Sequence, residues 1–207
     1  LSLLGENGSG KTTLMNMISG IYFPDEGHIC VGGREVTIRS PKDAYDHGIG
    51  MIHQHFKLVD VFTAAENIVL GLHDGKKLDR KEIARKVREI SDKYGFGIDP
   101  DKKIYDMSVS EKQTVEIVKV LFRGADILIL DEPTRGIDIG TKTEIQKLVL
   151  KLADEGKSLI FISSEIEEML RTCNRMAVLR DGQKVGEIDE ADMNQMNVMK
   201  AIAGGEQ

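Results

Sequence analysis

The chain has few cysteines and no long apolar run, and each absence excludes a class of protein. Only two cysteines occur among its 207 residues, Cys30 and Cys173, and they lack the close spacing of metal ligands. So sparse a pair is typical of a reduced cytosolic protein and not of a disulfide scaffold. No apolar run approaches the length of about 20 residues that a membrane-spanning helix needs. If the protein acts at a membrane, we therefore expect another chain to cross it.

An excess of positive charge is also missing. The 34 acidic residues outnumber the 28 Lys and Arg, which leaves a formal net charge of −6. Because nucleic-acid surfaces need a broad excess of Lys and Arg, we predict no nucleic-acid partner. With 41% hydrophobic residues, the chain can bury a substantial core. We expect residues 1–207 to form one domain with a smaller subdomain.

A glycine-rich segment near the start fills every fixed position of a phosphate-binding loop. It reads GENGSGKT, follows an apolar run and precedes the helix-like TTLMNMIS, which is the strand, loop and helix context that the motif requires. Lys11 is predicted to reach the β and γ phosphates and Thr12 to offer its hydroxyl to Mg²⁺. A glycine-rich turn with a stray lysine is the alternative, which the full spacing disfavours. The residues expected to hold the nucleotide are Gly5, Asn7, Gly8, Ser9, Gly10, Lys11, Thr12 and Thr13.

The hydrophobic pattern predicts an α/β fold with a P-loop core, in which helices flank a mostly parallel sheet. Apolar runs predict buried strands at 1–4, 49–52, 127–130, 159–162 and 176–179, and Gly32-Gly33 predicts a hairpin over 28–38. Helices are predicted at 12–19, at 141–155 and from residue 165. The segment 59–123 is mostly helical in pattern, so we predict a helical subdomain of about those residues inserted into the core. The tail after residue 188 has no readable pattern.

Two acids end one of the predicted strands. In ILILDE, Asp131 is expected at the carboxyl edge of the sheet, where nucleotide sites of such folds lie. Asp131 would complete the Mg²⁺ shell, and Glu132 would accept a proton from the attacking water or orient it. Alone, such a pair is often a helix cap or turn. The phosphate loop upstream favours the catalytic interpretation.

With these motifs in this order, the chain resembles the ATP-binding cassette (ABC) family from residue 1 to about residue 187. Gln54 in MIHQHF lies at the position of the Q-loop glutamine, and DEPTRGID adds a D-loop that ends in Asp138. MSVSEKQ, with Ser108 and Ser110, lies at the signature position and predicts a capped helix through either Ser108 with Glu111 or Ser110 with Gln113. The resemblance implies that Gln54 contacts Mg²⁺ or the attacking water, and that Ser108, Ser110 and Asp138 belong to the nucleotide-binding set, the serines acting on the ATP of a second cassette.

Some positions depart from the family pattern. Val109 and Ser110 replace the usual signature glycines, and Glu111 replaces the usual glutamine. Ser164 in FISSE stands where the H-loop has a histidine. We count Ser164 as catalytic but expect low turnover, because serine cannot supply the charge with which the histidine polarises the γ-phosphate. The family's adenine-stacking aromatic lies upstream of the phosphate loop, so we expect the chain to be truncated, with its N-terminal strands missing.

The chain looks like the ATPase subunits of bacterial importers for sugars and nucleosides in stretches such as GIYFPDEGHI and VEIVKVLFRGADILILDEPT. This resemblance implies an ATP-hydrolysing subunit with ATP and Mg²⁺ as cofactors. It would lie peripherally at the cytoplasmic face of the cell membrane, pair with a second cassette and drive a permease. The first half looks more like a first cassette and DEPTRGIDIGTKTEIQKLV more like a second cassette of fused double-cassette proteins, so the chain is either a divergent single cassette or a piece of a longer one. A catalytically weak regulatory cassette of a two-cassette ATPase is the alternative function, which Ser164 favours and Glu132 opposes. A soluble cassette protein of translation or DNA repair is disfavoured, because neither a basic surface nor a long coiled insertion is visible.

Overall fold

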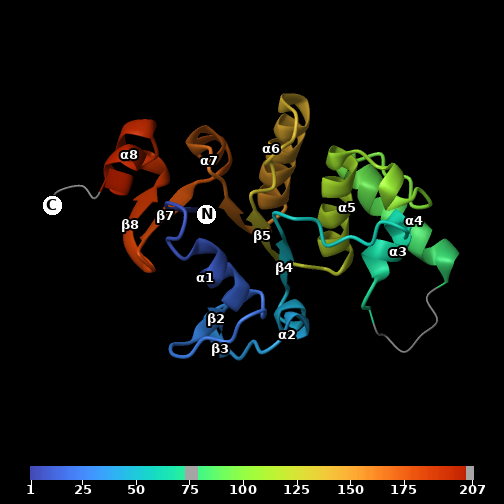
Figure 1. Cartoon of the computed structure of the whole chain (residues 1–207), viewed down its shortest axis with the longest axis horizontal. Coiled ribbons are helices and arrows are strands. Elements are labelled where there is room, and N and C mark those ends of the chain that lie inside the picture. The colour runs from blue at the N-terminus through green and yellow to red at the C-terminus, as the bar shows by residue number, and fades with distance from the viewer. Residues whose placement is uncertain (73–78, 204–207) are drawn as a thin grey trace. The chain divides into compact units, whose positions relative to one another are not determined.

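The computed structural model describes residues 1–72 and 79–203, and it divides the chain into two compact units (Figure 1). The first unit comprises Leu1–Met51 and Asp126–Gln207, and the second comprises Ile52–Ala125. The helical subdomain expected at 59–123 falls within the second unit, and its residues 73–78 lie outside the described residues. Within the described ranges, no helix is long and apolar enough to cross a membrane.

In the described part of the chain, six strands form one sheet in the order β4-β5-β6-β1-β7-β8. The strand β1 runs parallel to β6 and β7, β5 runs parallel to β6, and β8 is antiparallel to β7. This arrangement confirms the mostly parallel sheet that the apolar runs predict. The strands are β1 (Ser2–Leu4), β4 (Ile49–Ile52), β5 (Ile127–Asp131), β6 (Ser158–Ile162), β7 (Arg175–Arg180) and β8 (Gln183–Asp189).

The core of the first unit is an apolar cluster that joins strands to helices. Leu3 of β1, Ile129 of β5 and Met15 of the first helix are buried together in it. The predicted hairpin is confirmed as β2 (Ile29–Val31) paired with β3 (Arg34–Val36). The helices of this unit are α1 (Lys11–Ile18), α2 (Pro41–Asp46), α6 (Ile139–Asp154), α7 (Ile166–Thr172) and α8 (Gln195–Ala203).

The second unit is mostly helical and has its own apolar core. Its helices are α3 (Ala64–Val69), α4 (Arg80–Tyr94) and α5 (Val109–Phe122), with a 3₁₀ turn at Ile104–Asp106. Capping boxes begin α3 at Thr63 and α5 at Ser108. Ile83 and Val87 of α4 are buried while charged residues cover its other face, as the amphipathic pattern predicts.

The sequence analysis assigns no strand to 183–189 and no helix to 195–203, and the structure places β8 and α8 there. The strand β8 lies at the edge of the sheet and has one buried residue, Ile188, so its sequence lacks an apolar run. The turn before β8 does carry a sequence signal, the dipeptide Asp181-Gly182. Both residues have positive φ in the structure, as type I′ hairpin turns require. The predicted helix at 141–155 begins two residues earlier, because Asp138 caps α6.

Candidate functional site

The phosphate loop connects β1 to α1 in a backbone conformation that depends on glycine. Gly8 and Gly10 have φ of 87° and 94°, which residues with a side chain rarely adopt. At Gly5, a Cβ atom would lie 2.4 Å from both the carbonyl oxygen of Leu179 and Oγ of Ser9. No side chain caps α1, so its first N–H groups face the loop without a capping acceptor. This arrangement suits an anion such as a phosphate.

The polar side chains of the loop and the first turn point to the same function. Lys11 Nζ donates to the carbonyl oxygens of Gly5 at 2.6 Å and Glu6 at 3.0 Å. Among the described residues, Ser9 Oγ is buried without a hydrogen-bond partner. Thr12 and Thr13 are exposed in the first turn of α1. The Lys11 ammonium is therefore fixed at the loop, with hydroxyl groups close by in the chain.

The acids at the end of β5 share an electrostatic environment with Lys11. Asp131 is only 7% exposed, and burial raises its pKa, with the Glu132 carboxylate adding to the rise and Lys11 opposing it. Burial lowers the pKa of Lys11, while Glu132 and Asp131 oppose that shift. The structure thus brings Lys11, Asp131 and Glu132 together. At such a sheet edge, the carboxylates can hold a metal ion and the lysine can hold the phosphates of a nucleotide.

Glu132 has a strained backbone and a defined partner. Its φ is 49°, in the left-handed region that favours glycine, and its N–H donates to the carbonyl oxygen of Ile162 at 3.0 Å. Such a backbone conformation persists only when the surroundings enforce it. Ser164 Oγ donates to Oε2 of Glu132 at 3.2 Å. Both residues that the sequence analysis assigns to catalysis in this unit are therefore in contact.

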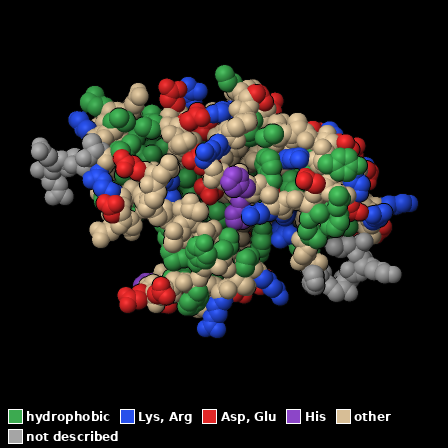
Figure 2. All heavy atoms as spheres, in the orientation of Figure 1, with side chains coloured by type: hydrophobic (Ala, Val, Ile, Leu, Met, Phe, Trp, Pro, Cys, Tyr) green, Lys and Arg blue, Asp and Glu red, His purple; other side chains and the backbone are tan. Residues whose placement is uncertain are grey.

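Gln54 belongs to the second unit and is half-buried, and His53 and His55 are its neighbours in the sequence. Figure 2 shows histidine side chains exposed on the face in view. Burial lowers the pKa of His53, which Glu116 opposes. His53 is therefore biased toward its neutral form.

The signature segment forms the Ser108 alternative of the two predicted capping boxes. Ser108 Oγ accepts from the N–H of Glu111 at 3.2 Å, and Glu111 Oε2 accepts from the N–H of Ser108 at 2.8 Å. Lys102 Nζ donates to Glu111 Oε1 at 2.6 Å and, together with the Ser108 N–H, lowers the pKa of that carboxyl. The charge of Glu111, a departure from the family pattern, is thus compensated within its own unit. Ser110 is half-buried, and its carbonyl oxygen accepts from Thr114 Oγ1.

Asp138, the last D-loop residue, is the N-cap of α6. Its carboxylate accepts from the N–H of Thr141 at 3.0 Å and from Oγ1 of Thr141 at 2.8 Å. These hydrogen bonds lower its pKa, so Asp138 remains charged at the start of the helix. Ile139, which follows it, is 83% exposed.

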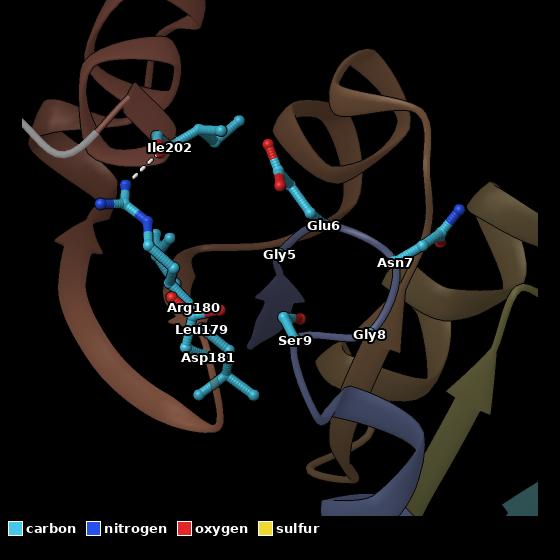
Figure 3. A pocket seen from close by; sticks show the side chains of 10 residues that line it. Gly5, Glu6, Asn7, Gly8, Ser9, Leu179, Arg180, Asp181 and Ile202 are labelled. Carbon is cyan, nitrogen blue, oxygen red and sulfur yellow. Dashed lines mark hydrogen bonds between the residues drawn. The ribbon is translucent and has the colours of Figure 1, made fainter.

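The turn between β7 and β8 contacts the phosphate loop, which the sequence analysis missed. The N–H of Gly182 donates to the carbonyl oxygen of Ser9 at 3.2 Å. A pocket of about 120 Å³ lies between the two segments. Figure 3 shows its lining, with Arg180 hydrogen-bonded to the carbonyl oxygen of Ile202. The Asp-Gly dipeptide was the available signal for this turn. A second missed residue is Glu168 of α7, which accepts hydrogen bonds from Thr134 and Ser163.

The fold and the site define a P-loop nucleotide-binding protein. Residues 1–135 match the ABC transporter family, and the chain belongs to this family. The match also confirms the resemblance drawn from the motifs.

Curated relatives match along nearly the whole chain. The guanosine import ATP-binding protein NupO of Bacillus subtilis is 46% identical, covering 99% of this chain and 41% of that protein. The nucleoside import ATP-binding protein NupA of Lactococcus lactis is 43% identical, covering 98% and 40%. The ribose import ATP-binding protein RbsA of Caldanaerobacter subterraneus is 38% identical, covering 100% and 42%. The chain therefore spans about two fifths of the length of these relatives.

Solved structures confirm the fold class. The ADP conformation of an ATP-binding cassette of an ABC transporter superposes with a TM-score of 0.83 at 24% identity, covering 98% of this chain and 87% of that one. The protein cbiO1 of Clostridium perfringens, part of an ABC transporter complex, superposes with a TM-score of 0.78 at 26% identity, covering 97% and 80%.

Proposed function

We propose that this chain is the ATP-binding and ATP-hydrolysing part of a bacterial importer that takes up a sugar or a nucleoside. The observation that carries this proposal is the identity of 46% and 43%, over nearly the whole chain, to import proteins for guanosine and nucleosides. Residues 1–207 would act as a single ABC ATPase domain, with the second unit as its helical part.

The residues of the loop fit ATP with Mg²⁺. The glycine conformations at 8 and 10, the uncapped start of α1 and the unpartnered Ser9 Oγ all suit phosphate oxygens. Thr12, Asp131 and Gln54 would hold the metal, which would neutralise charge that develops on the phosphates. Gly5, Asn7, Gly8, Ser9, Gly10, Lys11 and Thr13 would bind the nucleotide.

In the proposed mechanism, Lys11 supplies fixed positive charge at the outer phosphates. Glu132 would orient the attacking water or take its proton, because it follows Asp131 at the end of β5 and its charge influences the pKa of both Lys11 and Asp131. The Ser164 hydroxyl restricts the carboxylate of Glu132 by donating to Oε2. Gln54 would report the nucleotide state to the permease.

The proposed partners are a second cassette and the permease, at the cytoplasmic face of the membrane. Ser108, Ser110 and Asp138 would contact the nucleotide across the pair, and the capped start of α5 can present N–H groups there. The relatives are named as import proteins, and one similar cassette was solved as a dimer with ADP and phosphate, which supports pairing.

A regulatory cassette that binds ATP without appreciable turnover is the second candidate. Ser164 favours it, since a neutral hydroxyl replaces the family's histidine. Equilibrium binding of ATP compared with single-turnover hydrolysis separates the two functions. Co-purification with an integral membrane protein, followed by uptake of labelled guanosine or ribose into vesicles, tests the importer proposal, and absence of both would refute it.

A further inference from the structure

A buried glutamate connects the two loops that carry Glu132 and Ser164. Glu168 of α7 is 4% exposed, and its Oε2 accepts from Oγ1 of Thr134 at 2.6 Å and from Oγ of Ser163 at 2.8 Å. Thr134 lies two residues after Glu132, and Ser163 directly precedes Ser164. One carboxylate oxygen therefore fixes both loops.

The surroundings of Glu168 hold its side chain in place. Lys142 Nζ of α6 lies 3.4 Å from Oε1, and the same ammonium pairs with Glu165. Ser163 Oγ, which donates to Glu168, also accepts from the N–H of Glu165 at 3.0 Å. Thr172 Oγ1 donates to the carbonyl oxygen of Glu168 at 2.7 Å.

Stability alone does not explain a buried charge at this position. A buried carboxylate is costly even when it is paired, and apolar side chains of similar size are often as stabilising. The Glu168 carboxylate does accept short hydrogen bonds, which restrict the hydroxyl groups of Thr134 and Ser163. Glu132 needs such restraint, because its φ of 49° persists only where neighbouring groups enforce it.

We propose that Glu168 is a positioning residue, which keeps Glu132 and Ser164 in hydrogen-bonding register. Glu168 itself does not touch the reacting atoms. The inference rests on the proposed hydrolysis for its kinetic consequence, but the restraint on the loops is a property of the chain alone.

Hydrogen exchange tests the restraint without any nucleotide. The reporters are the N–H of Glu132, bonded to the carbonyl oxygen of Ile162, and the N–H of Glu165, bonded to Ser163 Oγ. In Glu168→Ala we expect their exchange to accelerate by about 10- to 100-fold, because two hydrogen bonds to a charged group are lost. Glu168→Gln keeps an acceptor oxygen and should restore part of the protection. The matched control is Glu167→Ala, an exposed neighbour on α7 whose carboxylate pairs with Arg171.

Kinetics test the consequence for the reaction. Single-turnover hydrolysis of MgATP by Glu168→Ala should slow by roughly 10- to 100-fold, with ATP affinity within about twofold of wild type, because misplacing a reacting group mainly affects the chemical step. The rate of Glu168→Gln should lie between the rates of wild type and Glu168→Ala, and the rate of Glu167→Ala should match that of wild type.

The outcomes decide the inference separately from the proposed function. Unchanged exchange at both reporters in folded Glu168→Ala would overturn it, as would faster exchange throughout the sheet or measurable hydrolysis that stays at the wild-type rate. If Glu168→Ala does not fold, Thr134→Val replaces it and removes one bond to Oε2. Ser163→Ala removes the other bond, and because it also removes the acceptor of the Glu165 N–H, its effect is measured at the Glu132 N–H alone. If wild type does not bind MgATP, the proposed function fails, while the exchange measurement still decides the role of Glu168.

Discussion

The Ser164 hydroxyl donates to Glu132 Oε2 across 3.2 Å, which joins the residue at the H-loop position to the proposed base. A hydroxyl orients the carboxylate but carries no charge to stabilise the phosphate. We therefore expect Ser164→His to raise the single-turnover rate by about 10²-fold or more, since a positioned charge-stabilising donor contributes that much. ATP affinity should not change. A partner cassette must be present, and Glu132→Gln should suppress the rate in both backgrounds. A fast wild-type rate that Ser164→His leaves unchanged would show that this position does not limit turnover.

Lys11→Ala should weaken ATP binding by roughly 10- to 100-fold, because Lys11 is the cation held within the phosphate loop by the carbonyl groups of Gly5 and Glu6, and hydrogen bonds to charged groups have this strength. Titration calorimetry with MgATP measures the change. Lys42→Ala, at an exposed position on α2, is the control and should bind as wild type does. Equal affinity in Lys11→Ala would refute the assignment of the phosphate loop.

Asp131→Asn should raise thermal stability at neutral pH while it abolishes hydrolysis. Burial raises the pKa of Asp131 above its unfolded value, so folding favours the protonated carboxyl. Stability from such a group is present below the unfolded pKa, about 4, and is lost as the pH rises through the folded pKa. The gain in Asp131→Asn should therefore be greatest above the raised pKa and vanish toward pH 4. Thermal unfolding across pH measures it, with the exposed Asp25→Asn as control. A stability gain that does not vary with pH would show that the ionisation of Asp131 is not its cause.

We propose that the segment from Gln54 to Leu72 docks against the permease, because it joins the glutamine at the Q-loop position to the helical part of the chain. Val61 is 64% exposed, whereas Phe56 and Phe62 are half-buried, so Val61 is the better probe of docking without loss of folding. Val61→Asp should reduce co-purification with the permease and reduce transport at least several-fold, since a charge in an apolar contact costs binding energy. ATP binding and the melting temperature should stay unchanged. The control Val185→Asp alters another exposed valine, on β8. Equal effects of the two variants would assign no special role to the segment.

Ser108→Ala should destabilise the protein by about 1 kcal/mol, because the hydroxyl caps α5 through the N–H of Glu111. Ser110→Ala is the matched control, since Ser108 is the N-cap, and it should change stability by less than about 0.5 kcal/mol. Chemical denaturation measures both. A larger loss in Ser110→Ala would mean that its side chain carries the structural role.

Local sequence signals predict the parts of the fold that local chemistry determines. The buried parallel strand β5 is a continuous apolar run, and Ser108 with Glu111 specifies its own cap. The edge strand β8 has no such run because only one of its seven residues, Ile188, is buried. The sequence does not single out Glu168 either: it follows Glu165 and Glu167, and it is the packing of α7 in the fold that buries Glu168. Long-range packing, and not residue type, therefore decides which of these acids serves the site.

The close approach of Gly5 to Leu179 has a consequence for variation in this chain. A methyl group at Gly5 would meet the Leu179 carbonyl oxygen at 2.4 Å, and the turn beyond it also binds Ser9 through Gly182. The β7–β8 turn thus contacts the phosphate loop from about 175 positions away in the sequence. An insertion of one residue in that turn would alter how tightly the nucleotide is held, although no residue of the loop had changed.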